Sequence, residues 1–465
     1  MSREAKLDGA ALSRLLGPWA HGGETLSGAL GRGIGELIDS NLIPTGTVLP
    51  PERELAGALH VSRGTVTSAM DALRAQGYIS SVRGSGTRVT RGLRGPRTGE
   101  GRMISFTDVP PGVVDLSTGA LPASSVTAEV LKAGPPSLSE FLGSDGYFPA
   151  GLPMLREALA DRLTADGVPT RASQILITSG AQQGTWLALS DLMEAGDLAV
   201  VEEPTYRGGL AVLRSLGTRI DTVPFTGTGM AVPLVASALR RRPAVLYCQT
   251  SVHNPTGRTT SANARRALAE LVDRHGQMTV EDVCSYDLTF RGPPARMLAG
   301  SVDEALLVTV GTLSKQFWGG IRVGWIRAHE HRIKRLTERR TSSDLASSVI
   351  DQLYATQCME RIGDARLERQ RTLNDHVVTT ESVVRDVFPD WRWDPIDGGA
   401  GLWVDTGTDA TALAELGKRK KVKIVAGPGF SAFDGFASML RLPIWHPEDQ
   451  LRNGLQRLAD AVAAA

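Results

Sequence analysis

The chain has 465 residues and a net charge of +1, with 42% hydrophobic and 22% charged residues. This length exceeds what one hydrophobic core usually serves and indicates two or three domains, and the composition is that of a soluble globular protein. The balanced charge excludes a protein that is polycationic over its whole surface, so any nucleic-acid-binding surface must be local.

The sequence carries no signal for a membrane or a secreted location. The N-terminal segment lacks the apolar core of a signal peptide, and no later run approaches the ~20 apolar residues that a membrane helix needs. The three cysteines, Cys248, Cys284 and Cys358, have no paired spacing, which argues against a disulfide framework or a cysteine zinc site. We expect a cytoplasmic protein with no membrane contact and no metal site.

Composition divides the chain into three zones. Residues 1–92 contain closely spaced helical patterns and are expected to form one domain with an N-terminal extension. Residues 93–112 are rich in Gly, Pro and Arg, which is typical of a linker. Residues 113–465 alternate apolar runs with longer amphipathic segments, as βα units do.

The first zone has the pattern of a winged helix-turn-helix. An amphipathic helix is expected from Leu26 to about Ile38, followed by a short helix in PERELAGALH and a second in SRGTVTSAMDALRAQG. Ser62 stands where an N-cap belongs and Gly77 where a C-cap belongs. The segment YISSVRGSGTRVTR then predicts a two-stranded wing.

The charge of this zone favours DNA as its partner. Seven arginines and one acid lie between Arg74 and Arg102, and Ser62, Arg63 and Thr65 begin a helix that can offer donors to phosphate and base edges. The segment LPPERELAGALHVSRGTVTSAMDALRAQGYISSVRGSGTRV resembles the GntR family. That resemblance implies operator-DNA contacts by Arg53, Ser62, Arg63, Thr65, Arg83 and Gly84.

The third zone predicts an α/β domain. Short apolar runs at Gln174–Thr178, Leu198–Glu202, Ala244–Gln249, Gln277–Glu281 and Ala305–Val310 read as strands of a sheet that is covered on both faces.

Two segments after these strands suit a flat, phosphorylated ligand. TSGAQQGTWLAL predicts a helix N-terminus whose amides, from Gly180, Ala181 and Gln182, bind an anion. VVEEPTYRGG presents Tyr206 just past a strand end, where it either stacks on a ring or packs the loop.

Two further segments supply charge and an amine. Asn254, in HNPTG, is a neutral donor. Asp282 at a strand end needs a cationic partner such as a protonated pyridine nitrogen. The adjacent Glu281 is the alternative carboxylate for that partner. Only eight of the 51 basic residues are lysines. A lysine in the Gly-rich segment GTLSKQFWGGIRVGW therefore indicates a specific role for Lys315. It suits a Schiff base, and Ser314 and Arg322 suit a phosphate.

Together these segments resemble fold-type-I pyridoxal-phosphate enzymes over residues 113–465, and the whole chain resembles the MocR regulators. The resemblance implies a large mixed-sheet domain, a small α+β domain, a homodimer and pyridoxal 5′-phosphate held on Lys315. Asp282 would then meet the pyridine nitrogen, Asn254 the ring 3-oxygen and Tyr206 the ring face. Ala181, Gln182, Ser314 and Arg322 would bind the phosphate. Arg441, in SMLRLP, matches an arginine that binds an effector carboxylate, and Tyr147 matches a tyrosine that reaches the partner's phosphate.

One position departs from the family pattern. A tyrosine that also bonds the ring oxygen is expected two or three residues after Asp282, where this chain has Cys284 and Ser285. Either Tyr286 reaches the ring from a shifted loop or the hydrogen bond is lost, which would weaken proton-transfer chemistry.

Three hypotheses follow. The first is a transcription regulator that binds double-stranded operator DNA and responds to pyridoxal phosphate or its adduct with a small amino compound, with little or no turnover. The second is an active aminotransferase with an accessory DNA-binding domain. The third is a regulator whose aminotransferase-like domain serves only for dimerisation.

Overall fold

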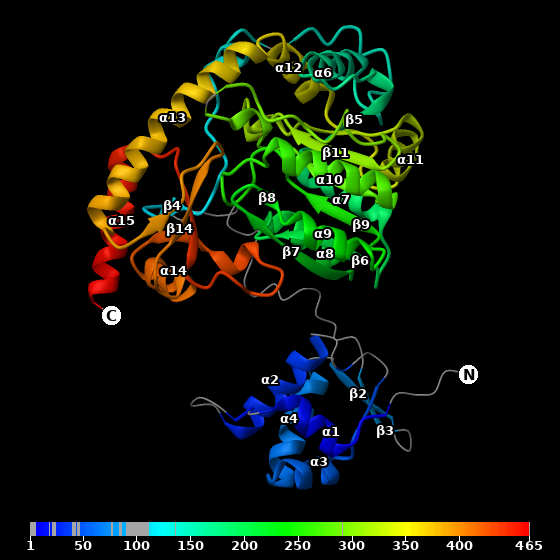
Figure 1. Ribbon diagram of the computed structural model, residues 1–465, viewed down its shortest axis with the longest axis vertical. Coiled ribbons are helices and arrows are strands. Elements are labelled where there is room, and N and C mark those ends of the chain that lie inside the picture. Colours follow the sequence, from blue (N-terminus) through cyan, green and yellow to red (C-terminus); the bar gives the residue numbers. More distant parts are fainter. Residues whose placement is uncertain are drawn as a thin grey trace. The chain divides into compact units, whose positions relative to one another are not determined.

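A computed structural model describes most of the chain, and the rest is drawn as a thin trace in Figure 1. The described residues are 6–17, 19–20, 25–39, 43, 47–75, 78–82, 86–89, 111–134, 136–290 and 292–464. The chain forms two compact units, Met1–Glu100 and Gly101–Ala465. Each unit has a hydrophobic core of its own.

The first unit packs helices on a small antiparallel sheet, as the sequence predicts for a winged helix-turn-helix. Its described elements are α1 (Gly9–Leu16), α2 (Leu26–Asp39), β1 (Val48–Leu49), α3 (Glu52–Leu59), α4 (Arg63–Ala75), β2 (Ile79–Val82) and β3 (Gly86–Val89). Apolar residues of α2, such as Leu30 and Ile34, share one core with Val66 and Met70 of α4. The strand order is β1-β3-β2, so β2 and β3 form the predicted wing.

The turn between α3 and α4 is short and capped. His60 ends α3 in the left-handed conformation, with φ at 55°, and Ser62 caps the next helix because its Oγ accepts a hydrogen bond of 3.1 Å from the amide of Thr65. The Ser62 N-cap is therefore confirmed. Gly77, which we expected to end α4, and the wing residues Arg83 and Gly84 lie outside the described residues.

The second unit contains a large subdomain built on an eight-stranded sheet (Figure 1). Its described elements are α5 (Ser125–Lys132), α6 (Pro153–Ala165), η2 (Ala172–Gln174), β5 (Ile175–Thr178), α7 (Ala181–Leu192), β6 (Leu198–Glu203), α8 (Arg207–Ser215), β7 (Arg219–Thr226), β8 (Gly229–Met230), α9 (Val232–Leu239), β9 (Val245–Cys248), α10 (Ala262–His275), β10 (Thr279–Asp282), η3 (Tyr286–Leu288), β11 (Leu307–Thr312), η4 (Gly319–Ile321), β12 (Gly324–Arg327), α11 (Glu330–Thr341) and α12 (Val349–Met359). The five strands expected from sequence are present, with ends shifted by one or two residues.

The sheet is mixed. Its order is β5-β12-β11-β10-β9-β6-β7-β8, and β12 runs antiparallel to both of its neighbours while β6, β7, β9, β10 and β11 are parallel. The central strands are buried along their whole length because helices cover both faces. Apolar side chains of α7, α8 and α11 join one core, and those of α6, α9, α10 and α12 join the other.

A small subdomain is built from both ends of the second unit. Its described elements are β4 (Val114–Leu116), α13 (Ile362–Val387), β13 (Arg392–Trp393), β14 (Gly401–Asp405), α14 (Ala410–Arg419), β15 (Val422–Ala426), η5 (Gly427–Phe430), β16 (Met439–Pro443) and α15 (Glu448–Ala463). The strand order is β13-β14-β16-β15-β4, so β4 from the start of the unit pairs with β15 near its end. The segment after β4 therefore leads directly from the small subdomain to the large one.

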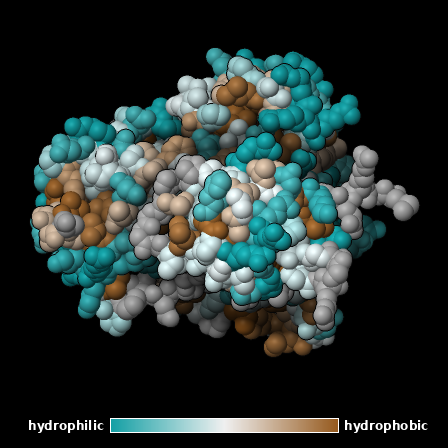
Figure 2. Space-filling view, turned by 90° about the horizontal axis from the view of Figure 1, so that it is seen from below, coloured by the Kyte–Doolittle hydropathy of each residue, from teal (hydrophilic) through white to brown (hydrophobic). Residues whose placement is uncertain are grey.

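Within the part of the chain that the structure describes, no helix is both long enough and apolar enough to cross a bilayer. The face in Figure 2 shows hydrophobic residues in separate groups among hydrophilic ones, which is ordinary for a protein surface.

Candidate functional site

The candidate site lies at the carboxyl ends of the parallel strands. Tyr206 follows β6 by three residues, Asn254 follows β9 by six, Asp282 is the last residue of β10, and Lys315 follows β11 by three. Because parallel strands end at one edge of the sheet, the fold brings these side chains together, and that edge is where open α/β sheets bind ligands.

Asp282 is held as an oriented carboxylate. Its side chain is 4% exposed; Oδ2 accepts a hydrogen bond of 2.8 Å from the Tyr247 hydroxyl, and Oδ1 accepts one of 2.9 Å from the amide of Cys284. Neither donor carries a charge, so this buried carboxylate still suits a cationic ligand atom. Glu281 faces the other side of the sheet, where Oε1 accepts hydrogen bonds from Thr250 and the amide of Leu298.

Lys315 is poised as a reactive amine. Its Nζ donates a hydrogen bond of 2.6 Å to the carbonyl of Gly119, in the segment after β4. Burial, together with the positive charges of Arg441 and Arg207, lowers the pKa of Lys315 to about 8. The negative charges of Cys284 and Asp282 raise this pKa but offset the lowering only in part. A substantial fraction of the amine is therefore neutral near physiological pH.

The N-terminus of α7 and Arg322 form a cradle for an anion. Gly180 precedes the helix with φ at 91°, and the first-turn amides of Ala181 and Gln182 need acceptors from outside the helix. Arg322 reaches this turn and donates a hydrogen bond of 2.6 Å to the carbonyl of Ser179. A Cβ at Gly180 would lie 2.8 Å from Nη2 of Arg322. The positive φ of Gly180 favours glycine at the entrance of this cradle, which has the donors that a phosphate needs.

Tyr206 is tied to the same cradle. Its hydroxyl donates a hydrogen bond of 3.2 Å to Oε1 of Gln182, and Nε2 of Gln182 donates one of 3.1 Å to the carbonyl of Gly208. Asn254 is fixed through its backbone, because its amide and carbonyl both bond the side chain of Gln249 at 3.1 Å. Its side-chain amide forms no hydrogen bond with any described residue.

Arg441 supplies a buried positive charge. It lies in the middle of β16 with 9% of its surface exposed, and it forms no hydrogen bond or ion pair with any residue that the structure describes. A Cβ on Gly119 would overlap its guanidinium, so Gly119 makes room for it. Burial, assisted by the charge of Arg207, lowers the pKa of Arg441 to about 10. A buried arginine in this state suits an anionic ligand.

Tyr286 does not replace the expected tyrosine. It begins η3, and its ring lies 5.9 Å from Cζ of Arg366. Burial raises the pKa of Tyr286 to about 12, and the charges that act on its hydroxyl belong to Asp166, Arg366, Asp287 and Arg162. The first alternative for Tyr286 is therefore wrong, because the 3₁₀ turn directs it to this cluster. Cys284 stands beside Asp282 instead, and burial raises the pKa of its thiol.

Comparison with known proteins agrees with this geometry. Residues 111–458 match the family described as aminotransferase class I and II, and residues 26–89 match the bacterial regulatory proteins of the gntR family. The chain belongs to the class I and II aminotransferase family in its MocR-type form. The first match covers most of the chain, and the second covers the helix-turn-helix.

Regulators of the same architecture are similar to this MocR-type chain along most of their length. It is 28% identical over 418 residues to YisV of Bacillus subtilis, an uncharacterized HTH-type transcriptional regulator, covering 84% of this chain and 86% of that protein. It is 28% identical over 450 residues to PdxR of Corynebacterium glutamicum, an HTH-type pyridoxine biosynthesis transcriptional regulator, covering 92% and 94%.

A solved structure shares the fold of the second unit. The alpha-aminoadipate aminotransferase LysN of Thermus thermophilus, complexed with N-(5′-phosphopyridoxyl)-L-leucine, has a TM-score of 0.69 and 24% identity, and the match covers 77% of this chain and 94% of that one. This likeness supports the predicted fold-type-I class with its mixed sheet.

The predicted DNA-binding residues that are described lie around the short turn of the MocR-type chain. Arg53 near the start of α3, and Ser62 and Arg63 at the start of α4, are exposed, while Thr65 is half-buried. Thr65 Oγ1 lies 2.8 Å from Oγ of Ser62, so the two hydroxyls form one polar group at the helix N-terminus. Their contact with DNA stays a prediction.

One predicted site residue is not brought to the site within this chain. Tyr147 is 57% exposed in the loop before α6, and its amide bonds the carboxylate of Asp145 at 3.0 Å. Its role towards a partner subunit stays a prediction. Ser314 directly precedes Lys315, and its amide donates a hydrogen bond of 3.1 Å to Oγ1 of Thr312, which fixes its backbone at the site.

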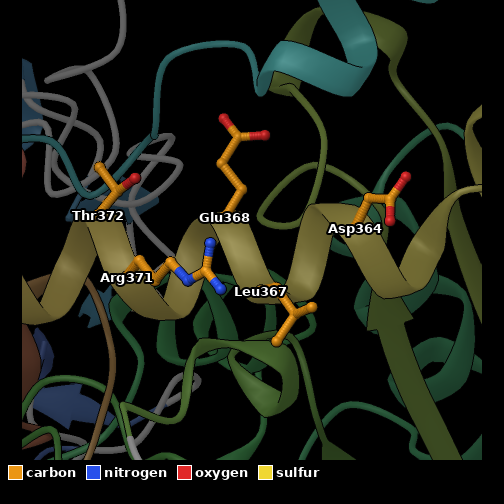
Figure 3. A pocket seen from close by; sticks show the side chains of 5 residues that line it. All are labelled: Asp364, Leu367, Glu368, Arg371 and Thr372. Carbon is orange, nitrogen blue, oxygen red and sulfur yellow. The ribbon is translucent and has the colours of Figure 1, made fainter.

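A surface hollow on α13 is lined by none of the site residues named above (Figure 3). The side chains that line it all come from one helix and are Asp364, Leu367, Glu368, Arg371 and Thr372. Glu368 accepts hydrogen bonds of 2.8 Å and 2.6 Å from the amide and hydroxyl of Ser125, at the start of α5. Its carboxylate therefore anchors one helix to another.

Sequence reasoning missed three site residues of the MocR-type chain. Tyr247 stands in an apolar strand, and its role depends on pairing opposite Val280, which places it on the Asp282 face of the sheet. Gly119 lies outside every quoted motif. Arg207, directly after Tyr206, is buried beside Arg441. Its sequence signal is an arginine in the otherwise apolar first turns of a helix.

Proposed function

We propose that the protein is a pyridoxal-phosphate-dependent transcription regulator that binds operator DNA and changes its affinity for DNA when an amino compound occupies the site around Lys315. The observation that carries the proposal is the union, in one chain, of a capped helix-turn-helix with a site in which Asp282, Lys315 and Arg441 converge. The names of relatives such as PdxR support it.

The residues fit the cofactor. Arg322 and the amides at the start of α7 would hold its phosphate, Asp282 would bond its pyridine nitrogen, Tyr206 would cover its ring, and Lys315 would hold its aldehyde carbon. When bound, pyridoxal phosphate supplies an electrophilic carbon that captures amines and a ring that withdraws electrons.

The chain's own residues prepare the site for an amino compound with a carboxylate. Arg441, which has no partner among the described residues, offers its guanidinium to that carboxylate, and the amine of Lys315 loses its proton readily because burial lowers its pKa to about 8. The segment carrying Gly119 contacts both Lys315 and Arg441 and connects the subdomains. Ligand binding to these residues favours one arrangement of the subdomains, and the equilibrium shifts only as far as the ligand prefers that arrangement.

We further propose that the regulator is a cytoplasmic homodimer in which Tyr147 of each subunit reaches the partner's cofactor. The domain boundaries proposed are 1–92 for the DNA-binding domain, 93–112 for the linker and 113–465 for the cofactor-binding domain. Sedimentation of the full chain with and without pyridoxal phosphate tests the dimer, and a monomer under both conditions contradicts it.

The alternative is an active aminotransferase with an accessory DNA-binding domain. The lowered pKa of Lys315 favours it, whereas Cys284 in place of the expected tyrosine disfavours proton transfer at the ring oxygen. A single-turnover experiment with common amino acids separates the two. Complete conversion of the bound cofactor to its amine form supports the enzyme, and spectral binding without conversion supports the regulator.

A further inference from the structure

A run of exposed cations lies at the end of α14 in the small subdomain (Figure 1). The segment ELGKRKKVK contains five cations and one acid, and its four consecutive cations, here called the basic turn (Lys418–Lys421), are all exposed. The acid, Glu415, pairs with Lys418. The three cations that follow Lys418 form no ion pair with any residue that the structure describes. Their charge is therefore open to an external anion.

The choice of lysine in the basic turn departs from the rest of the chain. Only eight of the 51 basic residues are lysines, and four of the eight lie between Lys418 and Lys423. An arginine guanidinium binds carboxylates and bases through paired hydrogen bonds, whereas a lysine ammonium is a compact point charge that binds a phosphate from any direction. The composition of the turn therefore favours contacts that depend on charge rather than on a fixed donor geometry.

The backbone of the basic turn carries a lysine where glycine is favoured. Lys420 is the C-cap of α14, and Lys421 follows it in the left-handed conformation, with φ at 58°. A helix that ends in this way usually has glycine or asparagine at that position, because a larger side chain raises the energy of the left-handed region. The helix dipole favours cations in the last turn of α14 but does not account for a lysine at the left-handed position after it. The strained position indicates a use for the charge of Lys421.

The segment that comes from the helix-turn-helix unit reaches the small subdomain beside the basic turn. The amide of Val114, the first residue of β4, donates a hydrogen bond of 2.9 Å to the carbonyl of Lys421. β4 then pairs with β15, which begins directly after the turn. Arg457 of α15 adds a further cation there, since its Nη1 donates a hydrogen bond of 3.2 Å to the carbonyl of Gly112. Cations therefore border the point at which the helix-turn-helix unit is tethered to the small subdomain.

A tether at this point favours DNA as the anion. DNA that the helix-turn-helix binds is attached, through the connecting segment, to the part of the second unit that carries the basic turn. Tethering of this kind turns a second contact into an intramolecular one, so contacts that are weak alone add to the total affinity. Duplex DNA carries one negative charge per about 1.7 Å of its axis and offers these charges whatever its sequence.

We propose that the basic turn is a second DNA-binding site, which binds backbone phosphates of the duplex that flanks the operator. The site contacts phosphates and no base edges, because exposed lysines supply charge without a donor pattern that distinguishes bases. The inference rests on the proposed function, because the helix-turn-helix must first hold the DNA. It goes beyond that function by assigning a DNA contact to the second unit.

The test compares two duplexes by fluorescence anisotropy of the full-length protein over a series of salt concentrations. One duplex is the shortest promoter fragment that keeps specific binding, and the other adds about 20 base pairs, or about 70 Å, of unrelated sequence on each side. The wild type is expected to bind the long duplex about ten-fold more tightly than the short one at low salt. In the triple variant Arg419→Gln/Lys420→Gln/Lys421→Gln, this gain should disappear. The slope of log Kd against log salt on the long duplex should fall by about 2–3, because each lost phosphate contact removes about 0.9.

Two further variants separate the charge of the turn from other effects. Arg240→Gln/Arg266→Gln/Arg274→Gln removes the same charge from exposed positions after α9 and in α10, and it should bind both duplexes as the wild type does. Lys421→Gly removes one cation together with the strain of the left-handed position. It should raise Tm and still weaken binding to the long duplex, which a loss of folding would not produce.

The outcomes separate the two proposals. Failure of the wild type to bind either duplex overturns the proposed function. Normal binding by the wild type, with the same salt slope in the triple variant on the long duplex, overturns the inference about the basic turn alone. Equal losses on both duplexes, or equal losses in the triple variant and its α9–α10 control, also overturn it. Binding of phosphatidylserine vesicles by the wild type but not by the triple variant, with DNA binding unchanged, overturns it in favour of an anionic membrane surface.

Discussion

The hydroxyl of Tyr247 donates a hydrogen bond of 2.8 Å to Oδ2 of Asp282 across neighbouring strands of the eight-stranded sheet. Tyr247 is fully buried and Asp282 is nearly so. The tyrosine therefore orients the carboxylate that would meet the cofactor nitrogen, and it does so from a strand that offers no other polar contact to the site. Orientation of this kind is a positioning role.

Tyr247→Phe is expected to weaken pyridoxal-phosphate binding. The substitution leaves Asp282 with the donors of Cys284, its amide and its thiol, and loss of one such hydrogen bond costs about 1 kcal/mol, or roughly five-fold in Kd. Equilibrium titration of the visible absorbance measures the change, and the fluorescence of the bound cofactor should shift because its ring nitrogen is less firmly protonated. Tyr354→Phe in α12 is the control. An unchanged Kd and spectrum would show that Tyr247 serves packing only.

The rate of cofactor capture should rise with pH, reach half its maximum near pH 8 and level off above that pH. Only the neutral amine reacts, and burial with the charges of Arg441 and Arg207 lowers the pKa of Lys315 to about 8, so the neutral form becomes available at lower pH than for an ordinary lysine of pKa about 10.4. Stopped-flow absorbance of the cofactor-free protein tests this. Arg441→Gln should move the plateau to higher pH. A rate that keeps rising to pH 10 in the wild type would contradict the account.

Much of the site follows from local sequence because its residues stand at strand ends. Apolar runs locate the strands, and the residues after them, such as Asp282 and Lys315, converge wherever parallel strands share an edge. The capped turn at Ser62 follows from equally local chemistry. These features depend on neighbours in the chain, which a sequence displays directly.

What the sequence does not predict depends on register or on docking. Tyr247 reaches Asp282 only because β9 pairs with β10 in one register. Arg207 meets the site only because η5 of the small subdomain docks on the loop before α8. Tyr286 turns away from the ring because η3 carries it to Arg366. Each of these outcomes needs the tertiary structure.

Asp287→Asn is expected to destabilise the cofactor-binding unit. Burial alone would raise the pKa of Asp287, but Arg162 and Arg366 outweigh burial and lower it. A carboxylate with a lowered folded-state pKa stabilises above its unfolded pKa of about 3.9, and this contribution is lost as pH falls through the folded value. The variant should lose about 3–5 kcal/mol of unfolding free energy at pH 7 and less at pH 3, because the contribution of the wild-type carboxylate begins to fall below a pH of about 3.9. Asp364→Asn, at an exposed ion pair, should change stability little. Equal losses at both pH values would contradict the assignment to charge.

Arg63→Ala is expected to weaken operator binding. Arg63 is the first residue of α4 and is exposed beside the Ser62 cap, so it is placed to contact a base edge or a phosphate. The loss should be about 1–3 kcal/mol for a base contact, with relaxed preference at one position of the operator. Arg14→Ala in α1 is the charge-matched control. Gel-shift titrations at one fixed salt concentration measure the operator affinity of both variants. Equal small losses of affinity in the two variants would indicate that Arg63 contributes only its charge.

The most direct test of the account is fluorescence anisotropy of the full-length protein on a fragment of its own promoter. Affinity is measured at constant salt without pyridoxal phosphate, with it, and with it plus common amino acids, for the wild type and for Lys315→Ala. Cofactor, or cofactor plus amino acid, is expected to change the Kd of the wild type at least several-fold and to leave that of Lys315→Ala unchanged. The same Kd for the wild type under all three conditions would contradict this expectation.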